Sequence, residues 1–505
     1  VTGVQTCALP ISSDVIYYIM EKVLQEALTF DDVLVIPRHS DVLPKDVNLQ
    51  TKLSRNLSLN LPFCSAAMDT VTESKMAIGL AALGGIGIIH KNNSPEEQAE
   101  EVRRVKKFES GIVRDPITIK STNTIGDLIQ LTSELNISGM PVVDDDALKG
   151  IVTGRDFRYA RDMDQTVATI MTKRENLITV KEGEDQEIVK SLMYKHRIEK
   201  VLVLDGSDKL VGLITMKDIE KAIDYPLASR DNEGRLIVGA ALGVGSDLEK
   251  RSEQLIGAGV DVLVIDSAHG DSKGVIDVLS YLKKSFPKVD VVAGNVATAD
   301  GAKLLIDNGA DAIKVGVGPG SICTTRIIAG VGVPQLTAVM NVASVAKDVP
   351  VISDGGIRFS GDIVKALGAG AYSVMLGSAF AGTEEAPGEV ELYQGRSFKT
   401  YRGMGSMGAM AKRTDANRYM QGEDIDTDKM VPEGIEGRVP FRGWLKDVIF
   451  QMEGGLRQGM GYTGSKTIED LKANIQFQKI TASGVKESHV HDVSITKEAP
   501  NYRAD

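Results

Sequence analysis

Cysteine is scarce in this sequence. The 505 residues contain only Cys7, Cys64 and Cys323. So few cysteines exclude a disulfide framework, and their wide spacing excludes the paired ligands of a structural zinc site. We therefore predict a protein of a reducing compartment, the cytoplasm.

An excess of basic residues and long apolar runs are also missing. The chain has 58 Lys and Arg against 69 Asp and Glu, a formal net charge of -11. This balance argues against a nucleic-acid partner or an anionic membrane, so an anionic substrate needs a local binding site. No stretch approaches the roughly 20 consecutive apolar residues of a membrane-spanning helix. Residues 1–12 also lack the basic start and apolar block of a secretory signal, so we expect no export.

The first residues show no hydrophobic period. The opening VTGVQTCALPIS fits neither a helix nor a strand pattern. We interpret residues 1–19 as a non-native leader and Met20 as the native start. Residues 1–19, with Cys7, are left out of the fold prediction.

From about residue 60 the chain alternates short β-branched runs with longer amphipathic stretches. The runs end in Gly, Asp or Ser, and strands this apolar on both faces are typical of parallel sheets covered by helices. Seven such units predict an α/β fold, a (β/α)8 TIM barrel formed by residues 20–110 and 228–505, with a doubly wound open sheet as the alternative. The runs are 61–69, 84–90, 260–270, 289–298, 311–320, 349–356 and 371–380.

Residues 111–227 interrupt this alternation with a duplicated unit. The closing strings Gly150–Asp156 and Gly212–Asp218 align, because they start at positions 150 and 212, a spacing of 62. The repeats cover about 112–170 and 172–227, and each half buries its apolar face best against the other. We predict a self-contained α+β module, inserted between the third and fourth barrel units.

A glycine-rich string at the end of a predicted barrel strand is the best candidate for chemistry. GVGPGSICTTR spans Gly316–Arg326, and its glycines let backbone groups approach a ligand, while Ser321 adds a donor for a phosphate. Cys323 follows in a polar setting where a thiolate can be stabilised and reached. Cys64, inside an apolar strand, is expected to be a buried hydrophobic residue.

Two later loops have the composition of a phosphate site. Asp354 precedes Gly355 and Gly356, and the next strand ends at Gly377 and Ser378. Loops after the seventh and eighth strands of such barrels often bind phosphate through glycine N–H groups. Asp354 suits ribose hydroxyls, which need an acceptor. A tight turn is a reasonable alternative for either loop alone, and less so for the two together.

The whole chain after residue 19 resembles one enzyme family. The strings EALTFDDVLVIP, SAAMDTVTE, IDSAHG, AGNVAT, GVGPGSICTTR, SDGGIR, YRGMGS and RYMQ occur in order and are similar to those of the IMP dehydrogenase / GMP reductase family. The duplicated module resembles a tandem pair of CBS domains, which bind adenine or guanine nucleotides in many proteins. Asp156 and Asp218 then either hold ribose hydroxyls or are ordinary helix N-caps.

The resemblance implies specific binding residues. Glu433 reads the purine ring, and Asp266, Asn295 and Gly316–Gly318, including Val317, lie near NAD in the barrel mouth. The nucleotide is held by Ser321, Asp354, Gly355, Gly356, Gly377, Ser378, Tyr401, Arg402, Gly403, Met404 and Gly405. A potassium ion is bound by Gly318, Gly320 and Cys323, with Glu487, Ser488 and His489 of a neighbouring subunit.

A two-step mechanism is implied in the same way. Cys323 attacks C2 of the hypoxanthine ring of inosine 5′-monophosphate (IMP), and hydride passes to NAD, which leaves a thioimidate. A mobile flap at about 405–437 then brings Arg418 as the base that activates water, with Tyr419 beside it and Thr325 positioning the water. The product is xanthosine 5′-monophosphate (XMP), a precursor of guanine nucleotides.

Two other functions remain open at this point. GMP reductase resembles the same barrel and cysteine loop, although Arg418 and Tyr419 favour hydrolysis. A non-catalytic nucleotide sensor of the CBS type is the alternative from another class, against which an intact set of Cys323, Thr325 and Arg418 argues. A homotetramer or octamer is expected from the resemblance.

Overall fold

The computed structural model describes residues 22–24, 26–108, 113–114, 116–135, 137–216, 224–411 and 431–502. The expected leader at 1–19 lies outside these residues, as do Asp218, Arg418 and Tyr419. About half of the expected flap, residues 405–411 and 431–437, is described.

Eight parallel strands close into a barrel with the order β13-β14-β15-β16-β17-β18-β4-β5. The predicted TIM barrel is therefore confirmed and the open sheet is wrong, because β5 pairs with β13 and closes the ring. The strands are β4 (Phe63–Ser65), β5 (Ile86–Ile89), β13 (Gly239–Leu242), β14 (Val262–Asp266), β15 (Asp290–Val296), β16 (Ala312–Val315), β17 (Val351–Asp354) and β18 (Ser373–Leu376).

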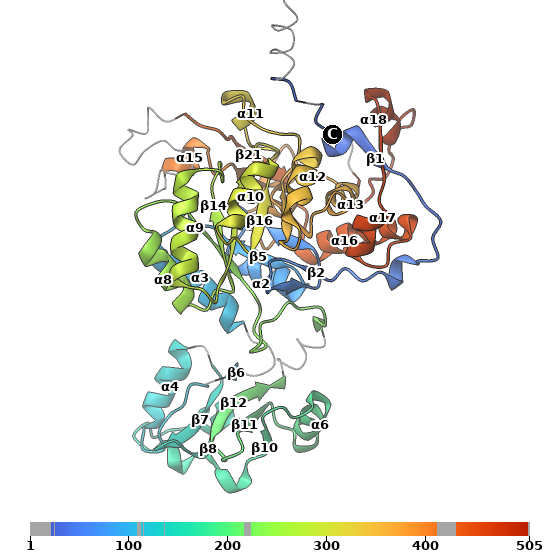
Figure 1. Ribbon diagram of the computed structural model, residues 1–505. Coiled ribbons are helices and arrows are strands. Elements are labelled where there is room, and N and C mark those ends of the chain that lie inside the picture. The colour runs from blue at the N-terminus through green and yellow to red at the C-terminus, as the bar shows by residue number, and fades with distance from the viewer. Residues whose placement is uncertain are drawn as a thin grey trace, which may run out of the picture.

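Helices follow the strands and cover the barrel (Figure 1). Helix α3 begins with a capping box, in which the Ser94 side chain accepts the N–H of Glu97. The covering helices are α2 (Ser74–Ala82), α3 (Pro95–Lys107), α8 (Leu248–Gly257), α9 (Lys273–Ser285), α10 (Ala299–Asp307), α11 (Thr325–Ile328), α12 (Gln335–Ala346), α13 (Ser360–Gly368) and α14 (Ser378–Ala381).

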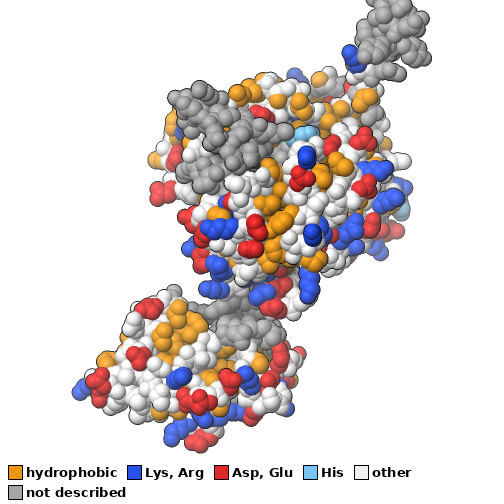
Figure 2. Space-filling model, turned by 60° about the vertical axis from the view of Figure 1, so that its left-hand side comes forward, with side chains coloured by type: hydrophobic (Ala, Val, Ile, Leu, Met, Phe, Trp, Pro, Cys, Tyr) orange, Lys and Arg blue, Asp and Glu red, His pale blue; other side chains and the backbone are white. Residues whose placement is uncertain are grey.

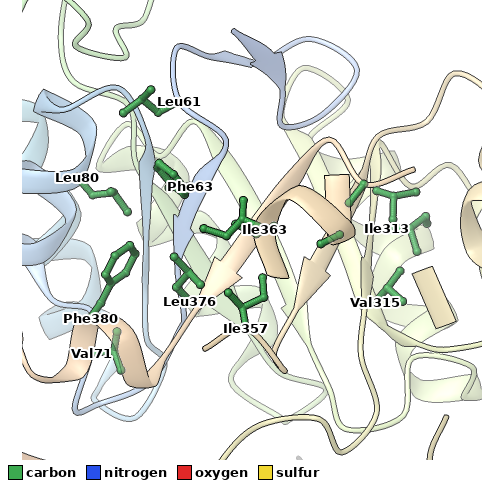
Figure 3. Close-up of a cluster of buried hydrophobic side chains, with 14 of the residues drawn as sticks. Leu61, Phe63, Val71, Leu80, Ile313, Val315, Ile357, Ile363, Leu376 and Phe380 are labelled. Carbon is green, nitrogen blue, oxygen red and sulfur yellow. The ribbon is translucent and has the colours of Figure 1, made fainter. Parts of the chain in front are cut away.

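Two apolar clusters lie on opposite sides of the barrel wall. Because side chains alternate along a strand, Phe63 and Ile313 pack outward against the helices, as in the cluster that Figure 3 draws. Cys64 and Ala312, their chain neighbours, belong to the inner cluster. Lys314 therefore projects inward on β16.

The segments outside the barrel close its ends. The apolar run before it forms β1 (Val33–Val35), which pairs antiparallel with β22 (Phe477–Lys479) and not with a barrel strand. The remaining elements here are η1 (Phe30–Asp32), β2 (Thr51–Lys52), β3 (Ser58–Leu59), β19 (Glu391–Tyr393), β20 (Arg396–Arg402), α15 (Met407–Ala411), β21 (Glu436–Pro440), α16 (Leu445–Thr463), α17 (Ile468–Asn474) and α18 (Ala482–Ser488).

The duplicated segment forms two small sheets that lie below the barrel in Figure 1. One has the order β10-β11-β12-β6 and the other β7-β8-β9, and an apolar cluster of Leu148, Ile151, Leu202, Leu204 and Leu213 joins the two halves. The elements are β6 (Val113–Arg114), α4 (Ile125–Glu134), β7 (Gly139–Asp144), β8 (Ala147–Thr153), α5 (Gly154–Phe157), β9 (Thr172–Lys173), β10 (Thr179–Lys181), α6 (Gln186–His196), β11 (Lys200–Leu204) and β12 (Leu210–Thr215).

The expected place of this insertion was wrong by one unit. It separates β5 from β13, the second and third strands of the barrel in chain order, and not the third from the fourth. The apolar run at β1 has the composition of a barrel strand but lies outside the ring. Of the predicted runs, only 61–69 and 84–90 precede residue 111, which agrees with the observed place.

Candidate active site

The loops at the carboxyl ends of the strands enclose two adjoining cavities. One has a volume of about 280 Å³ and the other about 150 Å³. They share Pro319, Gly320, Gly355, Met375, Gly377 and Tyr401 as lining residues. Most of the predicted site residues therefore surround one continuous space at the end of the barrel where such folds bind ligands.

Cys323 lies in the smaller cavity, in the loop between β16 and α11. Its thiol is partly exposed and lies 3.2 Å from the Thr325 hydroxyl. The backbone of this loop is bonded to the last part of the expected flap, because the Thr324 N–H donates to the Glu433 carbonyl over 3.0 Å. The structure thus brings Cys323, Thr325 and Glu433 together, as predicted.

The ends of β16 and β17 approach each other so closely that the first residue of the cysteine loop, Gly316, has no room for a side chain. Gly316 has φ +150°, and a Cβ there would lie 2.2 Å from the Asp354 carbonyl oxygen. The buried Gln335 side chain donates to both the Val315 and Asp354 carbonyls and closes the same junction. A side chain at residue 316 would separate β16 from β17, and with them the cysteine loop from the Asp354 loop.

The larger cavity has the features of a phosphate site. Ser321, Gly355, Gly356, Gly377 and Ser378 all line it, as predicted. The hydroxyl of Tyr401 bonds with Ser321, and burial raises the pKa of Tyr401 far above its usual value, so this phenol is a neutral donor at physiological pH.

The N-terminal segment completes this cavity, which the sequence analysis missed. Thr29, Phe30 and Asp31 line it, and Asp31 forms an ion pair with Arg358. The Lys365 ammonium also donates to the Phe30 carbonyl over 2.9 Å. The string EALTFDDVLVIP was noticed only as a family resemblance, because nothing in its spacing predicts where it packs.

A buried polar cluster lies beneath the smaller cavity. Asp266, Asn295 and Asp354 all bond to the ammonium of Lys314, a residue that the sequence analysis did not single out. Asn295 also donates to Asp354 over 2.9 Å. The sequence did contain a signal for this cluster, a lysine within an apolar strand. A buried lysine needs acidic partners, so such a residue predicts carboxylates beside it.

Some predicted residues lie elsewhere. The side chain of Arg402 points away from both cavities and forms a two-fold ion pair with Asp69, which lowers the pKa of Asp69 although burial opposes it. His489 lies beyond α18, where its ring packs against Phe359 and its Nδ1 lies 3.1 Å from the Tyr502 hydroxyl. The lining of the smaller cavity includes Gly403, Met404 and Glu433, and the Gly405 carbonyl accepts the Glu433 N–H.

In the duplicated module, Asp156 occupies the third residue of a helix and not its N-cap. Its carboxylate accepts the N–H and hydroxyl of Thr153, which is the N-cap of α5, over 2.6 Å and 2.9 Å. The interpretation of Asp156 as an N-cap is therefore wrong. Thr153 is the N-cap residue, and Asp156 is the second partner of its capping box.

The residues that the structure describes contain neither a candidate metal cluster nor a candidate membrane-spanning helix. Among these residues, no group of three or more His, Cys, Asp or Glu side chains is placed so that it could hold a metal ion. Within the same ranges, no helix has the length and apolar character needed to cross a membrane. On the face in Figure 2, Lys and Arg are interspersed with Asp and Glu.

The two described cysteines differ in their expected reactivity. Burial raises the pKa of Cys64 to about 12, so its thiolate is scarce below about pH 10, whereas Cys323 faces a cavity. We expect iodoacetamide to modify Cys323 and spare Cys64 in the native protein between about pH 7 and 9. Peptide mass spectrometry checks this, with denatured protein as the control in which both react. Equal labelling of both thiols in the native state would show that Cys64 is accessible.

Fold and site together define a (β/α)8-barrel protein with a partly exposed thiol in one cavity and a second, glycine-lined cavity beside it. A sequence profile of the IMP dehydrogenase / GMP reductase domain matches residues 27–491. The chain is 58% identical to inosine-5′-monophosphate dehydrogenase of Haemophilus influenzae, over 95% of this chain and 99% of the relative. It is 55% identical to the Escherichia coli K12 enzyme of the same name, over 96% and 99%. The chain belongs to the IMP dehydrogenase / GMP reductase family.

A solved structure supports the same assignment. GMP reductase from Trypanosoma brucei, crystallised as a cysteine-to-alanine variant in complex with guanosine 5′-monophosphate, superposes with a TM-score of 0.83. It is 41% identical, and the match covers 94% of this chain and 100% of that one. Overall fold is thus shared across the family.

Proposed function

We propose that this chain oxidises IMP to XMP with NAD, through a covalent bond between Cys323 and the purine. The observation that carries the proposal is that a partly exposed thiol lies in one cavity with residues proposed to bind the nucleotide and residues proposed to bind NAD. Cys323 shares its cavity with Asp354 and Gly355 and also with Asp266 and Asn295. The 55–58% identity to proteins named inosine-5′-monophosphate dehydrogenase supports it.

The proposed chemistry has two balanced steps. The Cys323 thiol loses its proton to solvent, the sulfur adds to C2 of the purine, and the hydrogen on C2 leaves with its electron pair. NAD, as the oxidant, accepts this hydride. Water then adds to the thioimidate carbon and the C–S bond breaks, which releases XMP and restores the thiol.

The nucleotide is held mainly by neutral donors and two acceptors. Backbone N–H groups of Gly355, Gly356 and Gly377, with the hydroxyls of Ser378 and Tyr401, suit a phosphate dianion. Asp354 accepts from ribose hydroxyls. Glu433, held beside the cysteine loop, receives a purine N–H, so a base without that donor would leave its acceptor unpaired. The other residues proposed for this role are Ser321, Gly403, Met404 and Gly405. The side chain of Arg402 is bonded to Asp69 outside both cavities.

The donor set of the smaller cavity fits NAD. Asp266 suits ribose hydroxyls and Asn295 a carboxamide, and the backbone of Gly316, Val317 and Gly318 allows close approach of a flat ring. These residues would orient a bound NAD toward the nucleotide and exclude water during the redox step.

Hydrolysis is assigned to residues around the cysteine and the flap. The Thr325 hydroxyl, 3.2 Å from the Cys323 sulfur, is placed to orient water near the thioimidate carbon. By family resemblance Arg418 is the base that activates this water, with Tyr419 beside it, in a flap at 405–437.

A potassium ion is proposed at the carbonyls of Gly318, Gly320 and Cys323. Carbonyl oxygens suit a hard cation, and the Gly320 carbonyl accepts one N–H, from Cys323, so a second lone pair remains for an ion. Glu487, Ser488 and His489 of a neighbouring subunit would complete the site in a homotetramer or octamer. No step of the reaction is assigned to the ion.

Residues 111–227 are proposed to be a tandem CBS module that binds purine nucleotides and regulates the barrel formed by 20–110 and 228–505. The two small sheets and the apolar cluster between them support this interpretation. Asp156 would have to break its capping box to hold a ribose, so backbone and apolar contacts carry more of the binding there. A cytoplasmic location follows from the proposed reaction in nucleotide biosynthesis.

The test is a comparison of two assays on the same preparation. We expect NADH to form from IMP and NAD, and no NADPH to be consumed with GMP. The reverse result would assign the chain to GMP reductase, the other activity of the family. No turnover in either assay, with potassium present, would favour the nucleotide sensor.

A further inference from the structure

Lys314 is a charged residue buried in the wall of the barrel. Its side chain is 2% exposed, and its Nζ lies 2.8 Å from Asp354 Oδ2 and 3.1 Å from Asp266 Oδ1. The same ammonium donates to Asn295 Oδ1. Its three partners belong to three other strands, β14, β15 and β17, so one group connects four of the eight strands at their carboxyl ends.

The neighbouring backbone is shaped to admit this side chain. A Cβ at Gly294, on the adjacent strand β15, would lie 2.7 Å from the Lys314 Cβ and 2.6 Å from its carbonyl oxygen. A buried ammonium is tolerated only with such compensation, since its desolvation is costly. Lys314 is thus held in one position by partners on several sides.

Its partners belong to both halves of the site. On the proposed function, Asp354 accepts from the ribose of the nucleotide, while Asp266 and Asn295 face the cofactor. Resting on that function, we propose that Lys314 is the positioning residue that couples the nucleotide subsite to the cofactor subsite. Its ammonium fixes the two sets of ligand-binding groups relative to each other, so that C2 and the hydride acceptor meet.

A coupling role has a thermodynamic consequence. A nucleotide that restrains Asp354 acts on Asp266 through the Lys314 ammonium, and on Asn295 both through Lys314 and through the direct Asn295–Asp354 hydrogen bond. The cofactor then finds its binding groups already ordered. By linkage, NAD strengthens IMP binding by the same factor as IMP strengthens NAD binding. A residue with only a structural role would change stability without changing this factor.

The chain offers a matched control at the opposite end of the barrel. Lys106 is also buried and also bridges two carboxylates, at 3.0 Å from Asp231 and 2.6 Å from Asp261. Lys106→Met and Lys314→Met therefore remove the same kind of group from the same kind of surroundings. Only the second faces the site.

Coupling is measured where no chemistry follows binding, in the Cys323→Ala background. Calorimetry gives the affinity for IMP with and without saturating NAD. We expect NAD to tighten IMP binding at least about five-fold in this background. Adding Lys314→Met should lower this ratio of IMP affinities with and without NAD, and the direct Asn295–Asp354 hydrogen bond should preserve only part of it. Adding Lys106→Met should leave the ratio unchanged.

The kinetic counterpart uses proteins that retain Cys323. In a single turnover, Lys314→Met should slow hydride transfer on the order of 100-fold, the effect of misplacing reactants by about an ångström. Lys106→Met should leave the rate unchanged. If Lys314→Met fails to fold, Lys314→Arg takes its place, because it keeps the charge but changes the donor geometry. We expect Lys314→Arg to reduce the ratio of IMP affinities measured with and without NAD.

The outcomes separate this inference from the proposed function. Wild-type protein that makes no NADH from IMP would overturn the proposed function. A normally active wild type whose Lys314 variants keep the parent's ratio and rate would overturn the coupling role alone. A ratio of one in the Cys323→Ala parent would also overturn it.

Discussion

Replacing Cys323 with Ala should abolish NADH formation from IMP, with a loss of at least about 1,000-fold, while IMP binding changes little. The sulfur is the atom that forms the covalent bond, and no neighbouring nucleophile replaces it on the proposed path. Binding rests on other residues, because the phosphate cavity is lined by the 355–356 and 377–378 loops and Tyr401. Steady-state assay and calorimetry measure the two effects separately.

Cys64→Ala is the matched control for this prediction. It removes a thiol that is fully buried in the barrel interior, where the sulfur contacts the Ser373 hydroxyl and lies in neither cavity. We expect a modest loss of stability, about 1 kcal/mol, with the rate of NADH formation retained. Turnover by Cys323→Ala within ten-fold of wild type would mean that the reaction needs no covalent bond to this residue.

Asp354→Ala should lower kcat/KM for IMP by on the order of 100-fold, about 3 kcal/mol. The change removes the ribose acceptor and also takes one of two carboxylates from the buried Lys314 ammonium, and truncating one partner of a buried charged pair costs about 2–5 kcal/mol. We expect KM for IMP to rise and kcat to fall together, because Asp354 both binds and positions. Initial-rate kinetics over a range of IMP concentrations checks this.

Asp311→Ala separates that effect from lost stability. Asp311 is also buried and also bonds a lysine, Lys283, but it precedes β16 at the amino end of the barrel. It should lower the melting temperature and leave KM for IMP unchanged. Equal KM values for IMP in Asp354→Ala and wild type would show that Asp354 does not bind the nucleotide.

The barrel was predictable because most of its strands are apolar on both faces and end in small or polar residues. The one barrel strand that this pattern missed is β13, the third in chain order. Its residues Gly239–Leu242 have the sequence GAAL, and alanine and glycine have little strand propensity. It forms a strand because β5 and β14 pair with it on either side. Tertiary pairing, which no local window contains, decided its structure.

The candidate site was predictable where chemistry needs a rare residue in a distinctive setting, as at Cys323 between glycines and threonines. Side-chain direction was not predictable: Arg402 lies next to Tyr401, yet strand alternation turns it toward Asp69 and away from the cavities. Thr29 and Asp31 were missed because they reach the phosphate cavity only through long-range packing. Lys314 was missed because its three partners come from distant strands.

The mass of the intact protein, quenched in acid during turnover with IMP and NAD, tests the covalent bond to Cys323 most directly. The account predicts a species heavier than the free chain by one IMP less two hydrogen atoms, with the added mass on the peptide that contains Cys323. It predicts no such species in Cys323→Ala under the same conditions. Steady turnover with no adduct on Cys323, at every quench time within one turnover, would contradict the account.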